Sequence, residues 1–284
     1  VSVYSNFIMN KIKKLNFLFF FNSIRGYKII EYFQKKKLKI QHIFVAKKFL
    51  DKKVIYSLKK KKINFTIIGS LKNKKINSNL IKCDFALICG FPLIFKKEMI
   101  NLPKKGFLNC HAGLLPKYRG GSPLNWQLIN NEKYFGISIL NVTKKIDSGE
   151  IVESKKFKLL KKHDIRDLHK ISNKAFPKML VSAINKILNK KKLKKLNFRN
   201  RKYFKQRSEK DSILYFGKKN FIDANCFVRA LQEPYPNAFI FHKKRKLKIK
   251  SLKSATIVLK PGKILKKNNK IFIGLKDKTA QIIN

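Results

Sequence analysis

The feature that most constrains the fold is a short, almost unbroken apolar run near the start of the chain, NFLFFF at residues 16–21. A strand with one wet face alternates apolar and polar residues, whereas a strand covered on both faces is apolar throughout. The run is far shorter than the ~20 residues that a membrane-spanning helix needs. No small-residue cleavage site follows it, so we do not expect a signal peptide. We predict a buried strand at residues 16–21, with residues 1–10 as an N-terminal extension.

Strand-like and helix-like patterns alternate after this run. Strands are predicted at residues 39–45, 65–68, 84–89 and 107–111, and helices at residues 27–35 and 51–61, the second capped by Asp51. Such alternation predicts right-handed crossovers and an open, parallel, Rossmann-like α/β sheet with helices on both faces. Ligands of such sheets bind outside the carboxyl ends of the strands, so we expect the loops after Phe21, Cys89 and Cys110 to matter most.

The last third of the chain has a different pattern. A helical repeat runs over residues 164–188 with Pro177 as a kink or break, and residues 190–206 are a Lys- and Asn-rich stretch typical of a linker. Short β-like runs then follow at residues 238–241, 247–252, 256–259 and 271–275, separated by turn-forming pairs such as Pro261-Gly262. We therefore predict a catalytic α/β domain over residues 11–189, a linker over 190–206 and a small, mostly β domain over 207–284.

Charge and cysteine content limit the classes of partner less than they first suggest. With 68 Lys and Arg against 15 Asp and Glu, the net charge of +53 is typical of proteins that bind nucleic acid or anionic membranes. However, Lys, Asn, Ile and Phe are abundant along the whole chain, and all four have AT-rich codons, so genome composition alone can explain the charge. The four cysteines include no C-x-x-C pair, which argues against a disulfide framework or structural zinc and fits a cytoplasmic location.

The stretch from Phe107 to Ile151 carries the candidate chemistry. Residues two apart on a strand face the same way, so Asn109 and His111 project together from the sheet edge, while Cys110 points into the core. Asp147 lies in a turn after a strand predicted at residues 136–142. An amide, an imidazole and a carboxylate around one site are what acyl or formyl transfer between nitrogens requires. Structural roles remain open for all three, because a strand-end His, a loop-tying Asn and an Asp-Ser-Gly turn are common.

The arrangement Asn109-x-His111, Leu114-Leu115-Pro116, Arg119-Gly120 and Asp147-x-Gly149 closely resembles the signature of folate-dependent formyltransferases. That superfamily includes methionyl-tRNA, glycinamide ribonucleotide and sugar-nucleotide N-formyltransferases. The resemblance implies 10-formyltetrahydrofolate as formyl donor, a primary amine as acceptor, and no metal. It also implies that Asn109 and His111 stabilise the oxyanion, and that Asp147 orients His111 and relays the proton of the amine. Residues 227–239 and 261–264 are similar to the OB-like C-terminal domain of these enzymes.

Further site residues follow from the same resemblance. Those implied to contact the folate are Gly90, Phe91, Pro92, Leu93, Leu114, Leu115, Pro116, Lys144 and Ile146. Those implied to contact the acceptor are Asn22, Arg25, Gly26, Arg119 and Gly120.

The chain also departs from this family pattern. Asn22 stands where the first turn normally begins with Gly, and we expect its tolerance of left-handed geometry to preserve the turn. The loop at residues 46–50 lacks the Pro and Gly of the tRNA-holding loop, and residues 123–126 are more similar to the amino-sugar enzymes. We therefore slightly favour an amino-sugar nucleotide as acceptor, with methionyl-tRNA as the alternative. A noncatalytic basic RNA-binding protein and a hydrolase of the formyl donor remain rival classes, and the oligomeric state is open.

Overall fold

The computed structural model describes residues 2–72, 74–193 and 202–284, so part of the predicted linker at 190–206 lies outside the described residues. By its internal contacts the chain forms two compact units. The first comprises Val1–Arg119, Gly136–Lys155 and Ile171–Arg201, and the second comprises Gly120–Phe135, Lys156–Lys170 and Lys202–Asn284. Four elements contain residues of both units, namely β6 (Arg119–Gly120), β7 (Tyr134–Asn141), β8 (Ile151–Lys158) and α7 (Ile165–Leu188).

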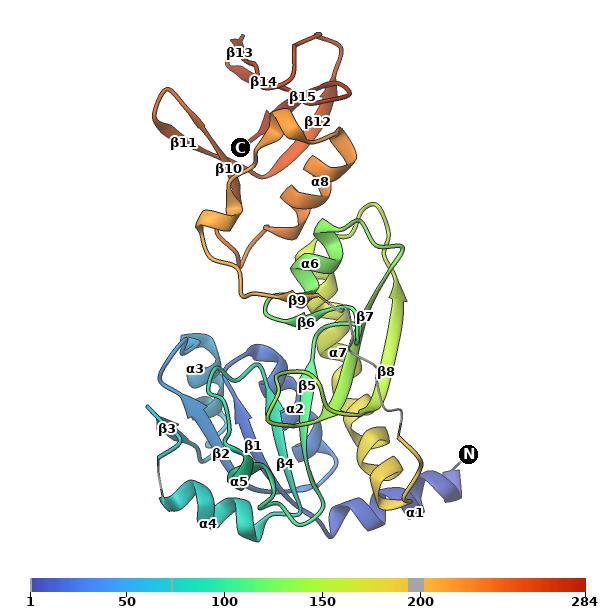
Figure 1. Cartoon of the computed structure of the whole chain (residues 1–284). Coiled ribbons are helices and arrows are strands. Elements are labelled where there is room, and N and C mark those ends of the chain that lie inside the picture. Colours follow the sequence, from blue (N-terminus) through green and yellow to red (C-terminus); the bar gives the residue numbers. More distant parts are fainter. Residues whose placement is uncertain (1, 73, 194–201) are drawn as a thin grey trace. The chain divides into compact units, whose positions relative to one another are not determined.

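A seven-stranded sheet in the order β3-β2-β1-β4-β5-β7-β8 forms the centre of the α/β part (Figure 1). Its strands are β1 (Asn16–Phe21), β2 (Lys39–Ala46), β3 (Thr66–Ile68), β4 (Phe85–Cys89), β5 (Gly106–His111), β7 (Tyr134–Asn141) and β8 (Ile151–Lys158). The helices are α1 (Ser2–Lys13), α2 (Ile24–Lys35), α3 (Lys52–Lys60), α4 (Lys74–Lys82), α5 (Lys97–Ile100) and α7 (Ile165–Leu188).

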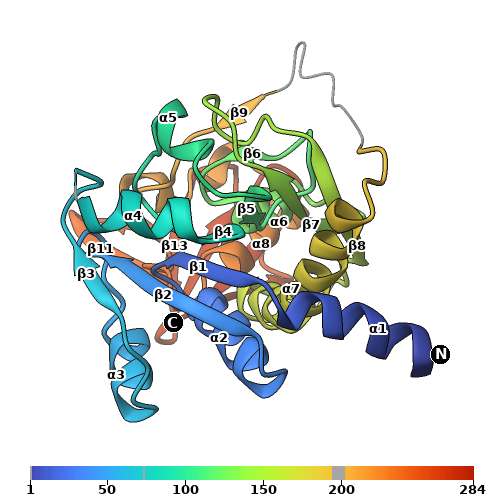
Figure 2. The ribbon, with the colours of Figure 1, turned by 90° about the horizontal axis from the view of Figure 1, so that it is seen from below.

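Both faces of β1 are buried, as the apolar run predicts. Phe17 and Phe19 point to one face, where their rings contact Phe33 of α2 at centroid distances of 5.0 and 5.1 Å. Phe20 points to the other face and belongs to the cluster that contains Leu80 of α4. Figure 2 shows α2 and α3 on one side of this part of the sheet and α4 on the other. The predicted two-sided α/β architecture is therefore confirmed.

The direction of one strand differs from the simplest expectation. Strands β3, β2, β1, β4 and β5 pair in parallel, but β7 pairs with β5 in the antiparallel sense. A strand buried on both faces has the same apolar pattern in either direction, so the sequence does not reveal this reversal. The sheet is thus mostly, not wholly, parallel.

The second unit contains the small β domain that the sequence predicts. Its elements are β6 (Arg119–Gly120), α6 (Pro123–Ile129), β9 (Tyr203–Phe204), the 3-10 helices Lys210–Ser212 and Phe216–Lys218, α8 (Phe221–Ala230), β10 (Ala238–His242), β11 (Arg245–Ile249), β12 (Ser251–Ala255), β13 (Ile264–Lys267), β14 (Lys270–Gly274) and β15 (Thr279–Ile283). Strands β10 and β11 form one antiparallel sheet, and β12-β15-β14-β13 form another. Helix α8 and both sheets share one hydrophobic core, which includes Phe227, Ile240 and Ile273.

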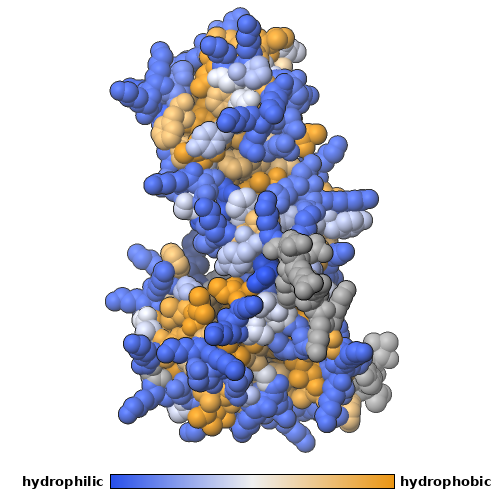
Figure 3. All heavy atoms as spheres, viewed as in Figure 1, coloured by the Kyte–Doolittle hydropathy of each residue, from blue (hydrophilic) through white to orange (hydrophobic). Residues whose placement is uncertain are grey.

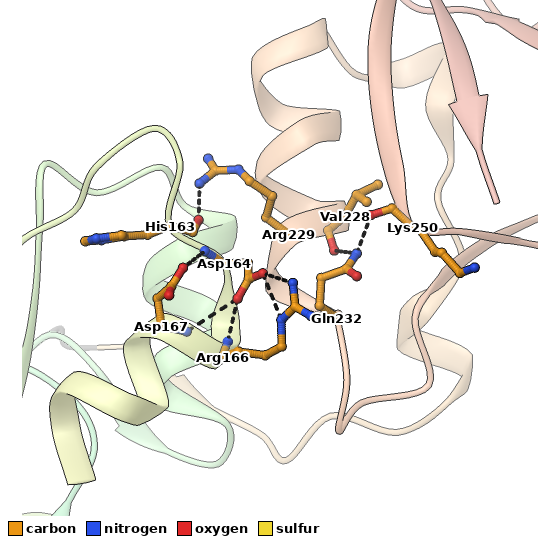
Figure 4. A network of polar contacts seen from close by, with 8 residues as sticks. All are labelled: His163, Asp164, Arg166, Asp167, Val228, Arg229, Gln232 and Lys250. Carbon is orange, nitrogen blue, oxygen red and sulfur yellow. Dashed lines mark hydrogen bonds and ion pairs between the residues drawn. The ribbon is translucent and has the colours of Figure 1, made fainter. Parts of the chain in front are cut away.

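Polar contacts also bind α8 to its surroundings within the second unit (Figure 4). Arg229 of α8 donates to the carbonyl of His163, just before α7. Gln232, after the end of α8, donates to the carbonyl of Lys250 at 2.6 Å, where β11 gives way to β12. The amide of Asn125 in α6 donates to the carbonyl of Ala230 at 2.7 Å. Helix α8 therefore connects α6, the start of α7 and the β sheets into one unit.

Several local predictions are confirmed and others are wrong. Asp51 caps α3 by accepting from the backbone N–H of Lys53. Helix α2 begins at Ile24, earlier than predicted, and α7 continues through Pro177 as a single helix. The predicted strand at 256–259 is wrong, since β12 ends before it. The predicted strand at 247–252 is two strands, because β11 pairs with β10 whereas β12 pairs with β15.

Most of the visible surface in Figure 3 is hydrophilic, in agreement with the high lysine content. The lysine run at residues 59–62 is exposed, and Lys61 forms an ion pair with Glu31 at 2.7 Å. Among the described helices, none has the length and hydropathy to cross a membrane.

Candidate active site

The end of β5 brings three predicted polar side chains together. The amide nitrogen of Asn109 donates to Oδ1 of Asp147 at 3.1 Å, and Nδ1 of His111 lies 3.5 Å from Oδ2 of the same carboxylate. The side chains of His111 and Asp147 are each only 6% exposed. One carboxylate therefore holds both the amide and the imidazole, although the residues come from positions 38 apart in sequence.

The second ring nitrogen of His111 is also engaged. Its Nε2 lies 2.6 Å from the backbone carbonyl oxygen of Tyr118. A carbonyl oxygen can only accept, so Nε2 must carry a hydrogen in this contact. The imidazole reaches a substrate oxygen only when this contact with Tyr118 is exchanged. In contrast, the amide of Asn109 carries two hydrogens, and Asp147 takes one of them.

The turn that carries Asp147 is stabilised by its own hydroxyl groups. Asp147 has a left-handed backbone with φ 49°, a conformation that Asp tolerates better than most residues. The hydroxyls of Thr143 and Ser148 both donate to the carbonyl of Lys145, at 2.9 and 2.7 Å. These bonds close the turn and fix where the carboxylate stands.

Arg119 contacts this turn from the loop that follows His111. Its Nη2 donates to the carbonyl oxygen of Ile146 at 2.8 Å, one residue before Asp147. The resemblance implies that Arg119 binds the acceptor, and the structure shows it bridging the two segments that carry the three polar side chains. Sequence reasoning missed this link, as it missed Thr143 and Tyr118, because backbone carbonyl partners leave no trace in a residue pattern.

Gly149 leaves no room for a side chain beside this turn. A Cβ at this position would lie 1.8 Å from the carbonyl oxygen of Asn141, and this oxygen can move only if the backbone moves with it. Gly149→Ala is therefore expected to displace the turn and to lower kcat by about 10²-fold, as a misplacement near 1 Å does. Steady-state kinetics would measure the loss. Gly69→Ala is the matched control, because a Cβ there meets nothing within 4 Å; equal losses in both variants would contradict this view of the turn.

Residues 22–26 lie at the carboxyl end of β1, but two of them serve the fold. The Asn22 amide donates to the carbonyls of Ala46 and Lys48 at 2.8 Å each, and its oxygen accepts from the N–H of Ala46 at 2.8 Å. Asn22 does not have the expected left-handed backbone; its side chain joins β1 to the loop after β2 instead. Gly26 serves the fold by its lack of a side chain, because a Cβ at this position would lie only 2.4 Å from the Phe21 side chain.

Arg25 has a more open role at the same edge. Its guanidinium lies 5.2 Å from the centroid of the Phe176 ring on α7, and its Nε is buried without a hydrogen-bond partner. The Arg25 guanidinium thus has hydrogen-bonding capacity left for a ligand.

The residues implied to contact the folate lie in three segments. Gly90, with φ +64°, lies just after β4 with Phe91 and Leu93, both half-buried against the apolar cluster of the sheet. Leu115 is 5% exposed in the loop after β5. The third segment, near Asp147, contains Ile146, which is 40% exposed, and the exposed Lys144. Leu114, Pro116 and Pro92 are half-buried in the first two segments.

Cys110 lies between Asn109 and His111 in sequence, but its thiol is not suited to act as a nucleophile. Cys110 is buried, and its hydrogen bond to Cys89 together with burial raises the pKa of the Cys110 thiol well above its usual range. The thiol therefore stays protonated, which excludes a thiolate nucleophile at neutral pH. No cluster of three metal-ligating side chains occurs among the described residues.

The chain belongs to the formyl transferase family. The model of the formyl transferase domain matches residues 33–184, and that of the formyl transferase C-terminal domain matches residues 207–284. The match agrees with the signature that the sequence resembles and with the α/β and β parts of the structure.

Individual relatives are moderately similar. The chain is 34% identical over 213 residues to the bifunctional polymyxin resistance protein ArnA of Wigglesworthia glossinidia brevipalpis, covering 72% of this chain and 31% of that protein. It is 27% identical over 204 residues to the methionyl-tRNA formyltransferase of Orientia tsutsugamushi, covering 71% of this chain and 66% of that protein. The chain thus spans about a third of the first relative and slightly less than two thirds of the second.

Solved structures share the fold. An N-formyltransferase from Helicobacter canadensis, in complex with folinic acid and dTDP-3-aminofucose, matches with a TM-score of 0.69 at 18% identity, over 95% of this chain and 99% of that one. A 4-N formyltransferase from Francisella tularensis matches with a TM-score of 0.67 at 20% identity, over 84% of this chain and 98% of that one.

Proposed function

We propose that the protein transfers a formyl group from 10-formyltetrahydrofolate to a primary amine. The observation that carries this proposal is the contact of Asn109 and His111 with the single carboxylate of Asp147 at the carboxyl end of β5. Membership of the formyl transferase family supports it. A binding protein has no need of an amide, an imidazole and a carboxylate in mutual contact, which disfavours the noncatalytic RNA-binding alternative.

The proposed reaction needs only these side chains and the two substrates. The lone pair of the amine attacks the formyl carbon, and the carbonyl oxygen becomes an oxyanion. The second N–H of Asn109 donates to that oxyanion, and the imidazole of His111 does so after leaving Tyr118. The Asp147 carboxylate accepts the proton that the amine loses. The oxyanion then re-forms the carbonyl group, the bond between the formyl carbon and N10 breaks, and N10 takes the proton from Asp147 as tetrahydrofolate leaves.

We propose an amino-sugar nucleotide as the acceptor, with methionyl-tRNA as the second candidate. The short loop at residues 46–50, which the Asn22 side chain holds against β1, supports the first. The similarity to methionyl-tRNA formyltransferases and the excess of lysine support the second. We also propose the division into a catalytic domain at 11–189, a linker at 190–206 and a C-terminal domain at 207–284, in a cytoplasmic protein.

One assay tests both the activity and the acceptor. The purified protein is incubated with 10-formyltetrahydrofolate and, in separate reactions, UDP- and dTDP-linked amino sugars, methionyl-tRNA, and buffer without an amine. Formylated sugar nucleotide with little formyl-methionyl-tRNA is the expected result. Formate release without any formylated amine would instead identify a hydrolase of the donor, and no consumption of the donor under any condition would refute the proposed activity.

A further inference from the structure

Two small residues interrupt the apolar strand β7. Residues 134–141 read YFGISILN, and Gly136 and Ser138, being two apart, face the same side of the sheet. Ser138 is 0% exposed. A buried hydroxyl costs free energy unless it is hydrogen-bonded, so its partners indicate what the serine is for.

The hydroxyl of Ser138 binds the loop that follows His111. Its Oγ donates to the carbonyl of Gly113 at 2.8 Å and accepts from the backbone N–H of Leu115 at 3.2 Å. The antiparallel register sets Ser138 directly opposite His111. One side chain thus holds the backbone on both sides of Leu114, immediately beyond the candidate catalytic histidine.

Gly136 shapes the same loop from the neighbouring position. A Cβ on Gly136 would lie 2.7 Å from Cδ1 and 3.0 Å from Cβ of Leu114. The side chain of Leu114 therefore packs directly on the backbone of β7. Gly136 and Ser138 together determine the position of residues 113–115, Ser138 by hydrogen bonds and Gly136 by close packing; we call this pair the β7 template.

The β7 template reaches the imidazole through the backbone. Ser138 fixes Gly113 and Leu115, the carbonyl of Leu114 accepts from the N–H of Tyr118 at 3.1 Å, and the carbonyl of Tyr118 faces Nε2 of His111 at 2.6 Å. The orientation of the ring thus depends on Asp147 on one side and on this loop on the other. Because Tyr118 contacts Nε2 directly, a shift of the loop moves the acceptor that aligns the ring.

We propose that Ser138 is a positioning residue for formyl transfer, which holds the loop at residues 113–118 so that His111 is aligned with the formyl group. The proposal rests on the proposed function for its kinetic consequence. Its structural consequence, the dependence of the His111 environment on the Ser138 hydroxyl, stands without it.

The test compares Ser138→Ala, which removes the hydroxyl, with Ser138→Thr, which restores it on a residue suited to a strand. Ser172→Ala is the matched control, since Ser172 is also 0% exposed but its Oγ has no hydrogen-bond partner. Ser138→Ala is expected to lower kcat by about 10- to 100-fold with little change in the acceptor KM. Ser138→Thr should recover most of the activity, and Ser172→Ala should retain it.

A second readout does not need turnover. In protein with labelled histidine, the ring signals of His111, assigned with a His111→Asn variant, should shift in Ser138→Ala and stay in place in Ser172→Ala. Unchanged His111 signals together with unchanged kcat in Ser138→Ala would overturn the proposal. Losses in kcat that track unfolding and are equal in Ser138→Ala and Ser172→Ala would do so as well. If the wild-type protein formylates no amine, the proposed function fails, and the signal shift still tests the positioning of His111.

Discussion

The Asn109→Ala variant is expected to lose about 10²- to 10³-fold in kcat, the usual effect of removing one oxyanion donor, while the protein stays folded. Asn109 is half-buried, and its amide donates one hydrogen to Asp147 at 3.1 Å, which directs the other toward the proposed oxyanion. The donor interacts more strongly with the oxyanion than with the ground-state carbonyl, so kcat should fall more than the KM of either substrate rises. Steady-state kinetics at saturating donor and acceptor would measure this split.

Asn79→Ala is a suitable control for this substitution. Asn79 is also half-buried in the first unit and hydrogen-bonded, since its amide donates to the carbonyl of Lys75 at 2.8 Å on α4. The control should keep the wild-type kcat. A wild-type kcat in Asn109→Ala, or a loss of activity that urea unfolding explains fully, would mean that Asn109 serves the fold and not the reaction.

The Asn22→Ala variant is expected to lower the free energy of unfolding by about 2–4 kcal/mol. The side chain of Asn22 is 6% exposed and makes hydrogen bonds of 2.8 Å to the N–H and the carbonyl of Ala46 and to the carbonyl of Lys48. Removing it leaves backbone groups without partners, each costing about 1–3 kcal/mol when buried. The midpoint of urea unfolding, at an unchanged m-value, would measure the loss.

This prediction separates a structural Asn22 from the acceptor-binding role that the resemblance implies. Ser23→Ala is the control, because the Ser23 hydroxyl makes only a long contact of 3.4 Å with the carbonyl of Cys89. If Asn22→Ala kept its stability and raised the acceptor KM instead, the acceptor-binding role would be correct.

Much of the fold could be predicted from the sequence, because burial leaves a pattern in it. The run of apolar residues in β1 predicts a strand covered on both faces, and Phe17, Phe19 and Phe20 are buried as expected. The direction of β7 could not be predicted, since the pattern of a fully buried strand is the same both ways. The sequence also did not reveal that residues 247–252 form two strands divided at Lys250. That division depends on the pairing of β11 with β10 and of β12 with β15, which the residue pattern does not show.

The candidate site was predictable where side chains contact side chains. The two-residue period of a strand brings Asn109 and His111 to one face, and the Asp-x-Gly turn locates Asp147. The supporting contacts were not predictable, because Tyr118 acts through its carbonyl and Ser138 binds backbone groups 23 and 25 residues earlier in the chain. A lone serine in an apolar strand was the available signal, and its meaning required the register of β5 and β7.

The proposed roles of Asn109, His111 and Asp147 can be tested with a crystal structure that contains a formyl-carrying folate and an amino-sugar nucleotide. We expect the formyl oxygen within about 3 Å of the amide nitrogen of Asn109, with His111 turned from Tyr118 toward it and the acceptor amine beside Asp147. A formyl group bound with none of these three side chains within hydrogen-bond reach would contradict these roles.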